Sequence, residues 1–583
     1  MGAEDTPQHP LRTDDVTGYE RANRASIRYH VPRLMRDVYQ EPGMEPCSIG
    51  DDSTWDHYPG QATAQFRLHS LGYLRTLTER YRESGELSYA DKADTLMRRW
   101  LSVRGQPDDT NAWHGHEVAL RTMTLSYLVA AGFSTGDDMT TALRTHADRL
   151  ADPAHYQGAW NHGLDQNIAL LQASAVLGDA ALSEVAQRRL SEAAAQYVDA
   201  QGVVAEQATS YASYVHARLG RAIRELERCG AEVDPAVRRR DLIPTFLAWA
   251  TRPDGLPVQI GDSMPEPSLN PDGSPHLEFV LSHGERGVPP TGRSIFYDDG
   301  WGFIRSGWGE HRPLREESHL TLRYGTFRRI HGHRDHTAIT WYASGREVLA
   351  DPGFSTYSDP EVRAYEQSET AHSAVTVPGA GKYRWERGTE LLSHSSYPLG
   401  EHEDMHLALL AGFPYDGVER RRAVLHIPVR NVLVVWDQIA AGKEVVALQN
   451  WQFGASFGPH AQPDSGLLTD GVGQVRLVQH LPTGGPRIDA GGTRPMAGWV
   501  ATGRDERVPA PCLTYEAAGD TVQFLTSLTL DGAATVRYTD EGILRLQGPD
   551  SGEVLMEVSL DPERGFVPRG LRPSLDSRWD HRV

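Results

Sequence analysis

The stretch His331-Gly-His-Arg-Asp-His336 runs directly into Thr337-Ala-Ile-Thr-Trp-Tyr-Ala-Ser-Gly-Arg-Glu-Val-Leu-Ala-Asp351, and Thr370-Ala-His372 follows shortly after. The runs Ala338 to Ala343 and Arg346 to Asp351 are rich in strand-forming residues, and Ser344-Gly345 between them favours a tight turn. Folding these runs into a hairpin pairs Ala338 with Asp351. The imidazoles that precede Ala338 are therefore expected near that carboxylate.

The residues around this hairpin are typical ligands of a metal site. We interpret His333, Asp351 and His372 as a metal triad, because neutral imidazole and carboxylate are ligands that divalent zinc uses. No CxxC or HExxH pattern accompanies them. The alternative, that these histidines are hydrogen-bonded loop residues beside a hairpin, stays open at the level of sequence.

Size and composition bound the class of protein. With 583 residues the chain exceeds what one hydrophobic core usually serves, and 39% hydrophobic and 23% charged residues are typical of a globular protein. No apolar run of about 18 residues occurs, which argues against a membrane span. A net charge of -20 argues against nucleic acid as a partner.

The polar, acidic first ten residues lack a secretion signal and predict a cytoplasmic location. Cys47, Cys229 and Cys512 lie too far apart in sequence to suggest a disulfide framework and are expected to be buried thiols.

The hydrophobic period divides the chain into a helical and a β-rich part. Apolar residues recur at helical spacing from about Tyr19 to about Val280, and Gly, Pro and Asp clusters between the segments predict antiparallel helical hairpins. Segments with this helical spacing include Ala62 to Ser84, Tyr89 to Val103 and Leu182 to Asp199. After Pro289, short strand-like runs predict an antiparallel sandwich. The predicted strands are Leu320 to Tyr324, Ala423 to Ile427, Val432 to Asp437, Val445 to Phe453, Val475 to His480 and Val522 to Leu528.

These patterns predict four regions. They are a flexible arm over residues 1–18, a helical domain over 19–288, a β domain over 289–572 and a polar tail over 573–583. The fold class is therefore α+β and multidomain.

Two clusters in the helical part carry polar side chains that could bind a ligand or take part in catalysis. Asn161-His162-Gly163 precedes the apolar segment Leu164 to Val176, and unpaired donors at a helix start suit an anionic group. An Asn cap beside a satisfied histidine is the alternative. On a helix, Gln207, Tyr211, Tyr214 and Arg218 would share one face that could line a sugar groove, or could simply pack against another helix.

Further polar residues are candidates for contacts with a ligand. Trp113-His-Gly-His116-Glu117 with Arg121 could form a groove wall or a structural Glu–Arg pair. An anionic substrate would need a locally basic cleft, for which Arg328, Arg329 and Arg334 are candidates.

Taken together, these pieces resemble the heparinase II/III-like polysaccharide lyases, including their alginate and oligoalginate lyase relatives, over most of the chain. The resemblance implies an incomplete N-terminal (α/α) toroid followed by a C-terminal antiparallel β-sandwich. One departure is Ser373, where the family usually carries Asn. The matching elements are Trp113 with Arg121, Asn161 to Gly163, Glu206-Gln207 leading to Tyr211, Gly255 to Asp262, Gly300 to Ser306, His331 to His333 with Asp335, Gly345 to Gly353, and Thr370 to His372.

The resemblance also implies an activity and assigns roles. A lyase of this kind cleaves uronic-acid glycosides by β-elimination and leaves a double bond between C4 and C5. Asn161 and His162 would bind the uronic carboxylate, and Tyr211 would be the acid. Either His331 or Tyr357 would be the base, with Tyr365 as the fallback for Tyr357. Residues expected to contact the substrate are Trp113, His116, Gln207, Tyr214 and Arg334.

The hypothesis also implies a cofactor and a binding partner. A divalent metal, with zinc as the first choice, would have a structural role, and the partner would be an acidic oligosaccharide or polysaccharide. A homodimer is one option for assembly. Tyr211 and His331 must face a common cavity. Two other functions remain: a toroid-type glycoside hydrolase that uses Glu117, Asp165 and Glu206, and a non-catalytic carbohydrate-binding protein.

Overall fold

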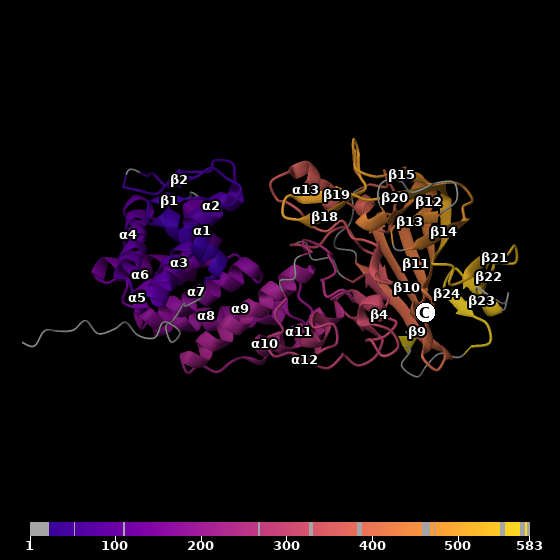
Figure 1. The fold of residues 1–583 in the computed structure, drawn as a ribbon, viewed down its shortest axis with the longest axis horizontal. Coiled ribbons are helices and arrows are strands. Elements are labelled where there is room, and N and C mark those ends of the chain that lie inside the picture. Colours follow the sequence, from indigo (N-terminus) through magenta and orange to yellow (C-terminus); the bar gives the residue numbers. More distant parts are fainter. Residues whose placement is uncertain are drawn as a thin grey trace, which may run out of the picture. The chain divides into compact units, whose positions relative to one another are not determined.

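The computed structural model describes residues 22–51, 53–108, 111–265, 269–325, 330–381, 388–457, 467–471, 473–548, 554–571 and 578–579. Helices dominate the first part of the chain and strands the second (Figure 1). Two compact units are present: unit 1 comprises Met1–Val198 and Val215–Arg240, and unit 2 comprises Asp199–Tyr214 and Asp241–Val583. The predicted arm 1–18 lies outside the described residues, as does the tail 573–583 apart from the short strand β25 (Arg578–Trp579).

Unit 1 is built from helices that pack against their neighbours in sequence, as expected for helical hairpins: α3 contacts α4, α5 contacts α6, and α7 contacts α8. One prediction was wrong, because the segment from Ala62 to Ser84 is two helices. Leu71 adopts a left-handed conformation with φ 54°, which ends α2, and a 3-10 turn precedes α3. The helices are α1 (Arg24–Leu34), α2 (Ala62–Ser70), α3 (Arg75–Ser84), α4 (Leu87–Arg104), α5 (Gly115–Ala130), α6 (Asp137–Ala151), α7 (Asn161–Leu177), α8 (Ala180–Tyr197), α9 (Thr209–Arg228) and α10 (Pro235–Arg238).

The first part of unit 2, Asp199–Tyr214, includes the start of α9, and two short helices follow, α11 (Ile243–Trp249) and α12 (Pro275–Leu281). An antiparallel five-stranded sheet follows, in which the strands are in sequence order. Its strands are β3 (Ser294–Tyr297), β4 (Trp301–Arg305), β5 (His319–Arg323), β6 (Ile339–Ala343) and β7 (Arg346–Leu349). The change from helix to strand thus falls between α12 and β3. The compact units divide the chain at other positions, after Val198, Tyr214 and Arg240. The predicted domain limits stay predictions.

A larger antiparallel sheet has the order β13-β14-β20-β12-β11-β10-β9-β25. One core cluster joins it to the five-stranded sheet, with Trp341 and Val348 on one side and Leu433 and Phe524 on the other. A second cluster joins its opposite face to the sheet β21–β24. The strands are β9 (Thr389–Gly400), β10 (Glu403–Tyr415), β11 (Val418–Ile427), β12 (Val432–Gln452), β13 (Leu467–Thr469), β14 (Gln474–Leu481), β20 (Cys512–Leu530), β21 (Thr535–Tyr538), β22 (Ile543–Gln547), β23 (Val554–Asp561) and β24 (Gly565–Pro568).

Two details of the β part correct the sequence predictions. The predicted runs Val432 to Asp437 and Val445 to Phe453 join, up to Gln452, in one long strand, β12, whose pairing with β20 shifts register between Ala440 and Val445. The predicted hairpin exists as β6 and β7, but a bulge between Trp341 and Tyr342 shifts its register by one residue. Ala338 and Asp351 flank the ladder rather than pairing within it.

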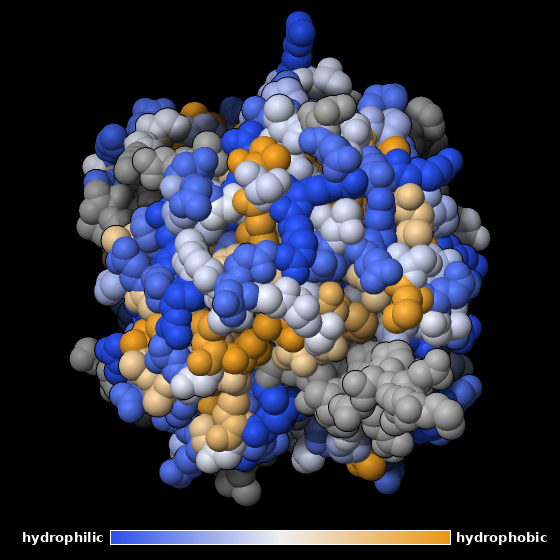
Figure 2. Space-filling view, turned by 90° about the vertical axis from the view of Figure 1, so that its left-hand side faces the viewer, coloured by the Kyte–Doolittle hydropathy of each residue, from blue (hydrophilic) through white to orange (hydrophobic). Residues whose placement is uncertain are grey.

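Surface properties agree with an ordinary globular protein. Hydrophilic residues predominate on the face in Figure 2, and apolar residues form smaller patches. Among the residues that the structure describes, no helix combines the length and hydropathy needed to cross a membrane. The cytoplasmic location stays a prediction.

The three cysteines are free, and Cys512 is buried, but Cys229 is exposed at the end of α9, which corrects the expectation of a buried thiol there.

Candidate active site

His331 and His333 lie on the loop between β5 and β6, and both contact Asp262. His331 Nδ1 is 2.7 Å from Asp262 Oδ2, and His333 Nε2 is 3.0 Å from Asp262 Oδ1. The Asp262 amide also donates to the His331 carbonyl oxygen at 2.9 Å. Gly261 permits this approach, because a Cβ on this residue (φ 65°) would lie 2.6 Å from the carbonyl oxygens of Gln207 and His331. The loop is therefore fixed to the segment that carries Asp262.

Asp262 is the centre of a dense hydrogen-bond network. Its side chain is buried, and Arg363 pairs with both of its oxygens, at 2.6 Å from Oδ1 and 2.8 Å from Oδ2. The Tyr357 hydroxyl donates to Oδ2 at 2.8 Å. Burial alone would raise the pKa of this carboxyl, but the hydrogen bonds from His331 and His333 and the charge of Arg363 hold the pKa well below its usual value. Asp262 is therefore an ionised acceptor.

The ring of Tyr211, in the first turn of α9, stacks on that of His331 as the hypothesis required, with centroids 3.5 Å apart and an interplanar angle of 10°. Its hydroxyl is 3.2 Å from the Tyr357 hydroxyl. Burial raises the pKa of Tyr211 to about 12. Half of the Tyr357 side chain is exposed, but its hydroxyl lies among Asp262, Tyr211 and His331. Burial of this hydroxyl is the larger cause that raises the pKa of Tyr357, and the negative charge of Asp262 is the next. Both phenols therefore keep their protons at neutral pH.

The second nitrogen of His331 is available for chemistry. Nε2 lies 3.5 Å from Glu206 Oε2 and has no hydrogen bond within the described part of the chain. Burial lowers the pKa of His331, although the contact with Asp262 opposes this effect. An imidazole that donates from Nδ1 to Asp262 carries its lone pair on Nε2.

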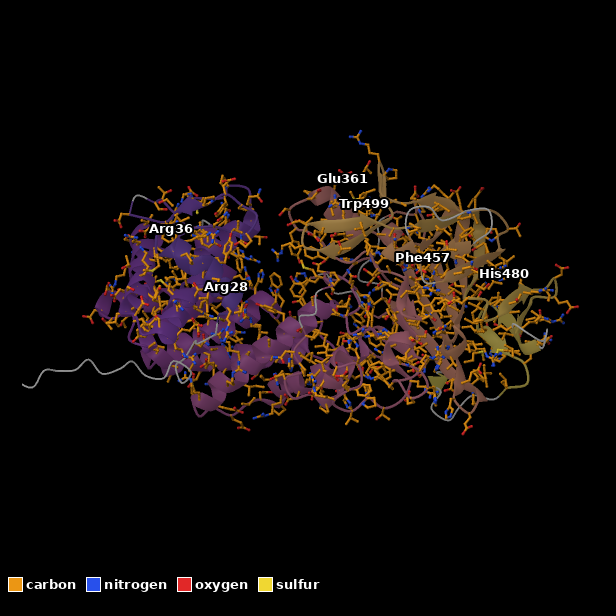
Figure 3. The ribbon with its side chains drawn as sticks, in the orientation of Figure 1. Arg28, Arg36, Glu361, Phe457, His480 and Trp499 are labelled. Atoms are coloured by element: carbon orange, nitrogen blue, oxygen red, sulfur yellow. The ribbon has the colours of Figure 1, made fainter. Side chains whose placement is uncertain are left out.

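The segment that carries Tyr357 and Arg363 is anchored by α13 (Pro360–Glu366). The Arg363 guanidinium lies 5.2 Å from the ring centroids of both Phe354 and Tyr357. The Tyr365 hydroxyl accepts from the Trp499 amide at 3.0 Å and donates to the Trp499 carbonyl at 3.1 Å. Glu361 on α13 and Trp499 on β18 (Trp499–Gly503) accordingly lie close together in Figure 3. Because Tyr365 is buried in this contact, its role as a fallback base is not supported.

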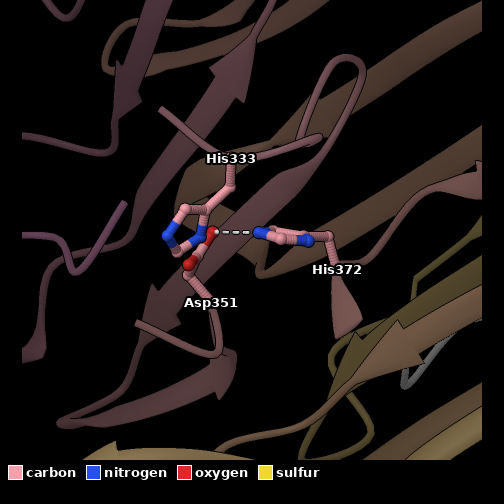
Figure 4. A group of neighbouring side chains, drawn as sticks. All are labelled: His333, Asp351 and His372. Atoms are coloured by element: carbon pink, nitrogen blue, oxygen red, sulfur yellow. Dashed lines mark ion pairs between the residues drawn. The ribbon is translucent and has the colours of Figure 1, made fainter. Parts of the chain in front are cut away.

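The predicted metal triad forms a compact group. His333, Asp351 and His372 are all buried, and their potential ligand atoms lie within 4.8 Å of one another (Figure 4). His372 Nε2 is 3.6 Å from Asp351 Oδ2, beyond hydrogen-bond distance. The two histidines thus approach the carboxylate from the β5–β6 loop and from the turn before β8 (Val375–Thr376).

The chemistry of these atoms fits a divalent cation. His372 Nδ1 donates to the Ser368 carbonyl at 2.7 Å, which leaves a lone pair on Nε2, and His333 Nε2 donates to Asp262, which leaves one on Nδ1. Neither of these lone-pair nitrogens has a hydrogen-bond partner among the described residues. Burial raises the pKa of Asp351 despite the nearby histidines, so its anionic form would gain from a cation. Zinc sites use such imidazole and carboxylate ligands, each fixed by a further hydrogen bond.

Asn161 and His162 start α7 in unit 1, with Trp160 as the N-cap residue. The His162 ring stacks on that of His116 with centroids 3.9 Å apart, and His116 Nε2 bonds to Asp165 Oδ2 at 2.9 Å. Asp165 also pairs with Arg218 at 3.1 Å. The structure therefore groups the predicted residues Asn161, His162 and His116 within unit 1, and Tyr211, His331 and Tyr357 within unit 2.

Other predicted substrate-contacting residues have different surroundings. Trp113 is 1% exposed and packs against His146 and Arg121, so a contact with substrate is not supported. Gln207 is also 1% exposed and has a left-handed φ of 56°, which places it before α9 rather than on the predicted helix face. Tyr214 lies on α9 with its ring centroid 6.3 Å from that of Tyr211, and Arg334 is exposed. Arg328 and Arg329 lie outside the described residues.

Asp262 is the central residue that the sequence analysis did not select. It stood only within the matching stretch Gly255 to Asp262, because its carboxylate has no local pattern that marks it as functional. The signal that could have identified it is the Gly-Asp pair, since a glycine before a buried acid indicates a close backbone approach.

Comparisons with known proteins agree with this architecture. Residues 295–532 match the family model described as Heparinase II/III-like, C-terminal. The chain is similar to the crystal structure of heparinase III, with a TM-score of 0.74, 16% identity and 92% coverage of each chain. It is also similar to a mutant of the heparan sulfate lyase HepC from Pedobacter heparinus, with a TM-score of 0.67, 16% identity and coverage of 94% of this chain and 90% of that one. A Paenibacillus xanthan lyase gives a TM-score of 0.52 at 8% identity, over 92% of this chain and 61% of the other. A search of curated proteins finds no match. These likenesses confirm the predicted fold class, a toroid followed by a β-sandwich.

Proposed function

We propose that this chain, whose residues 295–532 match the heparinase II/III-like C-terminal family model, is a polysaccharide lyase that cleaves uronic-acid glycosides by β-elimination. The observation that carries the proposal is the stacking of Tyr211 on His331 beside Tyr357 and Asp262. This cluster offers a protonated phenol and an imidazole lone pair within one small volume. Elimination needs one group of each kind.

In this mechanism Tyr211 is the general acid. The C5 hydrogen of a uronic acid is removed as a proton, and the departing glycosidic oxygen must be protonated as the C4–O bond breaks. A phenol whose pKa is raised to about 12 by burial is protonated at neutral pH and can donate to that oxygen. After the step, Tyr211 regains a proton from water and His331 releases the C5 proton to water, while the Tyr357 hydroxyl, 3.2 Å away, stays a hydrogen-bond partner of Tyr211.

His331 is the better candidate for the base. Its Nε2 carries a lone pair in the orientation that Asp262 sets, and a base needs such a lone pair. Tyr357 would have to become a phenolate while its hydroxyl faces the Asp262 carboxylate, and two adjacent negative charges disfavour that state. The proposal therefore assigns proton abstraction to His331 and a hydrogen-bonding role to Tyr357.

The remaining roles rest on the family resemblance. Asn161 and His162 are proposed to bind the uronic carboxylate and so to share the negative charge that develops on it. His333, Asp351 and His372 would hold a divalent metal, proposed to be zinc. When bound, this ion would join the His331 loop to the β6–β7 hairpin. Elimination has no hydroxide nucleophile, so the ligands need not leave an open coordination position.

A screen of uronic-acid oligosaccharides tests the proposal. The double bond between C4 and C5 absorbs in the ultraviolet, whereas hydrolysis creates no such absorbance. We expect the absorbance to rise with at least one uronide and to be lost in His331→Ala. Release of reducing ends without new absorbance would favour the hydrolase alternative, and binding without any turnover would favour a carbohydrate-binding protein.

A further inference from the structure

One buried carboxylate contacts both a proposed catalytic histidine and a proposed metal ligand. From this geometry we infer that Asp262 is a positioning residue, which fixes the tautomers of His331 and His333 and thereby links metal binding to the orientation of the base. The part of this inference that concerns turnover rests on the proposed function. The part that concerns metal binding stands on the triad alone.

The tautomers follow from the direction of the hydrogen bonds. A neutral imidazole has one N–H, and an ionised carboxylate can only accept, so the nitrogen that faces the carboxylate carries the hydrogen. At His331 the bond from Nδ1 to Asp262 Oδ2 is 2.7 Å long and leaves Nε2 as the lone-pair atom. At His333 the bond from Nε2 to Asp262 Oδ1 is 3.0 Å long and leaves Nδ1 for the metal. Each oxygen of one side chain thus sets the free nitrogen of one histidine.

Asp262 is held firmly enough to transmit a change from one histidine to the other. The two Nη atoms of Arg363 contact its two oxygens, a forked pairing that restricts rotation of the carboxylate. Its amide is bonded to the His331 carbonyl at 2.9 Å. A shift of His333 toward a bound ion therefore acts on the same rigid group that orients His331.

Groups that orient metal ligands commonly change metal affinity or activity by about 10- to 100-fold when they are replaced. Asp262→Asn retains the size of the side chain but replaces one acceptor oxygen with a donating amide. Only one of the two imidazoles can then keep its present hydrogen bond. Glu317→Gln is the matched control, because Glu317 is also buried in unit 2 but bonds to Ser306 and to the Gly309 amide.

The experiment uses the full-length protein and Zn²⁺ as the probe. Its affinity is measured by competition with a chromophoric chelator, and kcat and KM are measured with a uronide that the wild type cleaves. We expect Asp262→Asn to raise the Kd for Zn²⁺ by about 10- to 100-fold and to lower kcat by a similar factor, with KM changed less than about twofold. Glu317→Gln should lower the melting temperature without changing the Kd or kcat.

Several outcomes overturn the inference. Wild-type Zn²⁺ affinity in a folded Asp262→Asn variant does so, as does a rise in KM with kcat unchanged. If Asp262→Asn does not fold, Arg363→Gln removes the fork that holds the carboxylate and should shift the Kd and kcat in the same directions by several-fold, and no shift counts against the inference. If the wild type cleaves no uronide, the proposed function fails, while the Zn²⁺ measurement still decides the role of Asp262 in metal binding.

Discussion

At the scale of single residues, the position of Tyr211 has a direct consequence. Its ring covers His331 and its hydroxyl contacts that of Tyr357, so removing the hydroxyl changes the chemistry but not the packing. We predict that Tyr211→Phe lowers kcat by about 100- to 10,000-fold, the usual contribution of a general acid, with an unchanged melting temperature. Tyr342→Phe, on β6, removes a hydroxyl that donates to the Arg315 carbonyl at 3.1 Å and should retain most of the activity. Equal losses in the two variants, followed by ultraviolet absorbance, would remove Tyr211 from the mechanism.

The choice of base gives a second prediction. If His331 abstracts the proton, His331→Ala should lose at least about 100-fold in kcat, whereas Tyr357→Phe should lose less because it removes one hydrogen bond to Asp262. Initial rates on the same uronide, with circular dichroism to confirm folding, provide the comparison. A larger loss in Tyr357→Phe would transfer the role of base to Tyr357.

The sequence was informative about site residues that lie close together in the chain. His333 and Asp351 could be grouped because one hairpin brings them together, and His372 follows one segment later. Tyr211 could be selected because of its helical spacing. Asp262 could not be placed, since its contact with His331 joins positions 69 residues apart. The expectation that Gln207 shares a helix face with Tyr211 was wrong, because the positive φ of Gln207 places it before α9.

At the scale of elements, Arg422 on β11 connects the large sheet to the metal-triad loops. It makes a forked pair with Asp437 on β12 and donates to the carbonyls of Thr337 and Ser373, next to the loops that carry His333 and His372. All of these contacts are buried. The sheet therefore supports the two loops through one guanidinium.

Replacing this guanidinium should be costly. We predict that Arg422→Leu lowers the free energy of unfolding by about 3–5 kcal/mol, because Asp437 would remain as a buried charge without its partner. Arg421→Leu, at the next position, breaks a partly exposed pair with Glu419 and should cost about 0–1 kcal/mol. Urea unfolding monitored by tryptophan fluorescence measures both, and similar costs would contradict the assigned role.

Element types were more predictable than element limits. Runs of strand-forming residues on either side of Ser344-Gly345 identified the β6–β7 hairpin, but the bulge that shifts its register depends on packing that these runs do not record. Ala440-Ala-Gly-Lys-Glu444 suggests a turn, yet these residues lie within β12, where the register shift against β20 accommodates them. Leu71 likewise ends α2 with a positive φ, and the glycine at this break, Gly72, lies one position later.

At the scale of the whole molecule, the metal triad lies entirely within unit 2. Ligand binding stabilises only the part of a protein that it holds folded, by about 2.7 kcal/mol at a metal concentration of 100 times Kd. We predict two unfolding transitions in calorimetry, of which a chelator or His333→Ala lowers only one. Wild-type metal content in His333→Ala, or a shift of both transitions by the same amount, would contradict this prediction.

The division of the chain into units has a consequence for its modular use. Residues 199–214 belong to unit 2 although unit 1 resumes at Val215, and α9 continues through that boundary. A truncation after Val198 would discard the rest of unit 1, and one after Arg240 would retain the tyrosine segment without its histidine loop. No single cut yields either unit whole. Recombination that exchanges one unit between homologous genes must therefore join the chains at three places, Val198/Asp199, Tyr214/Val215 and Arg240/Asp241, so the two parts are expected to be inherited together.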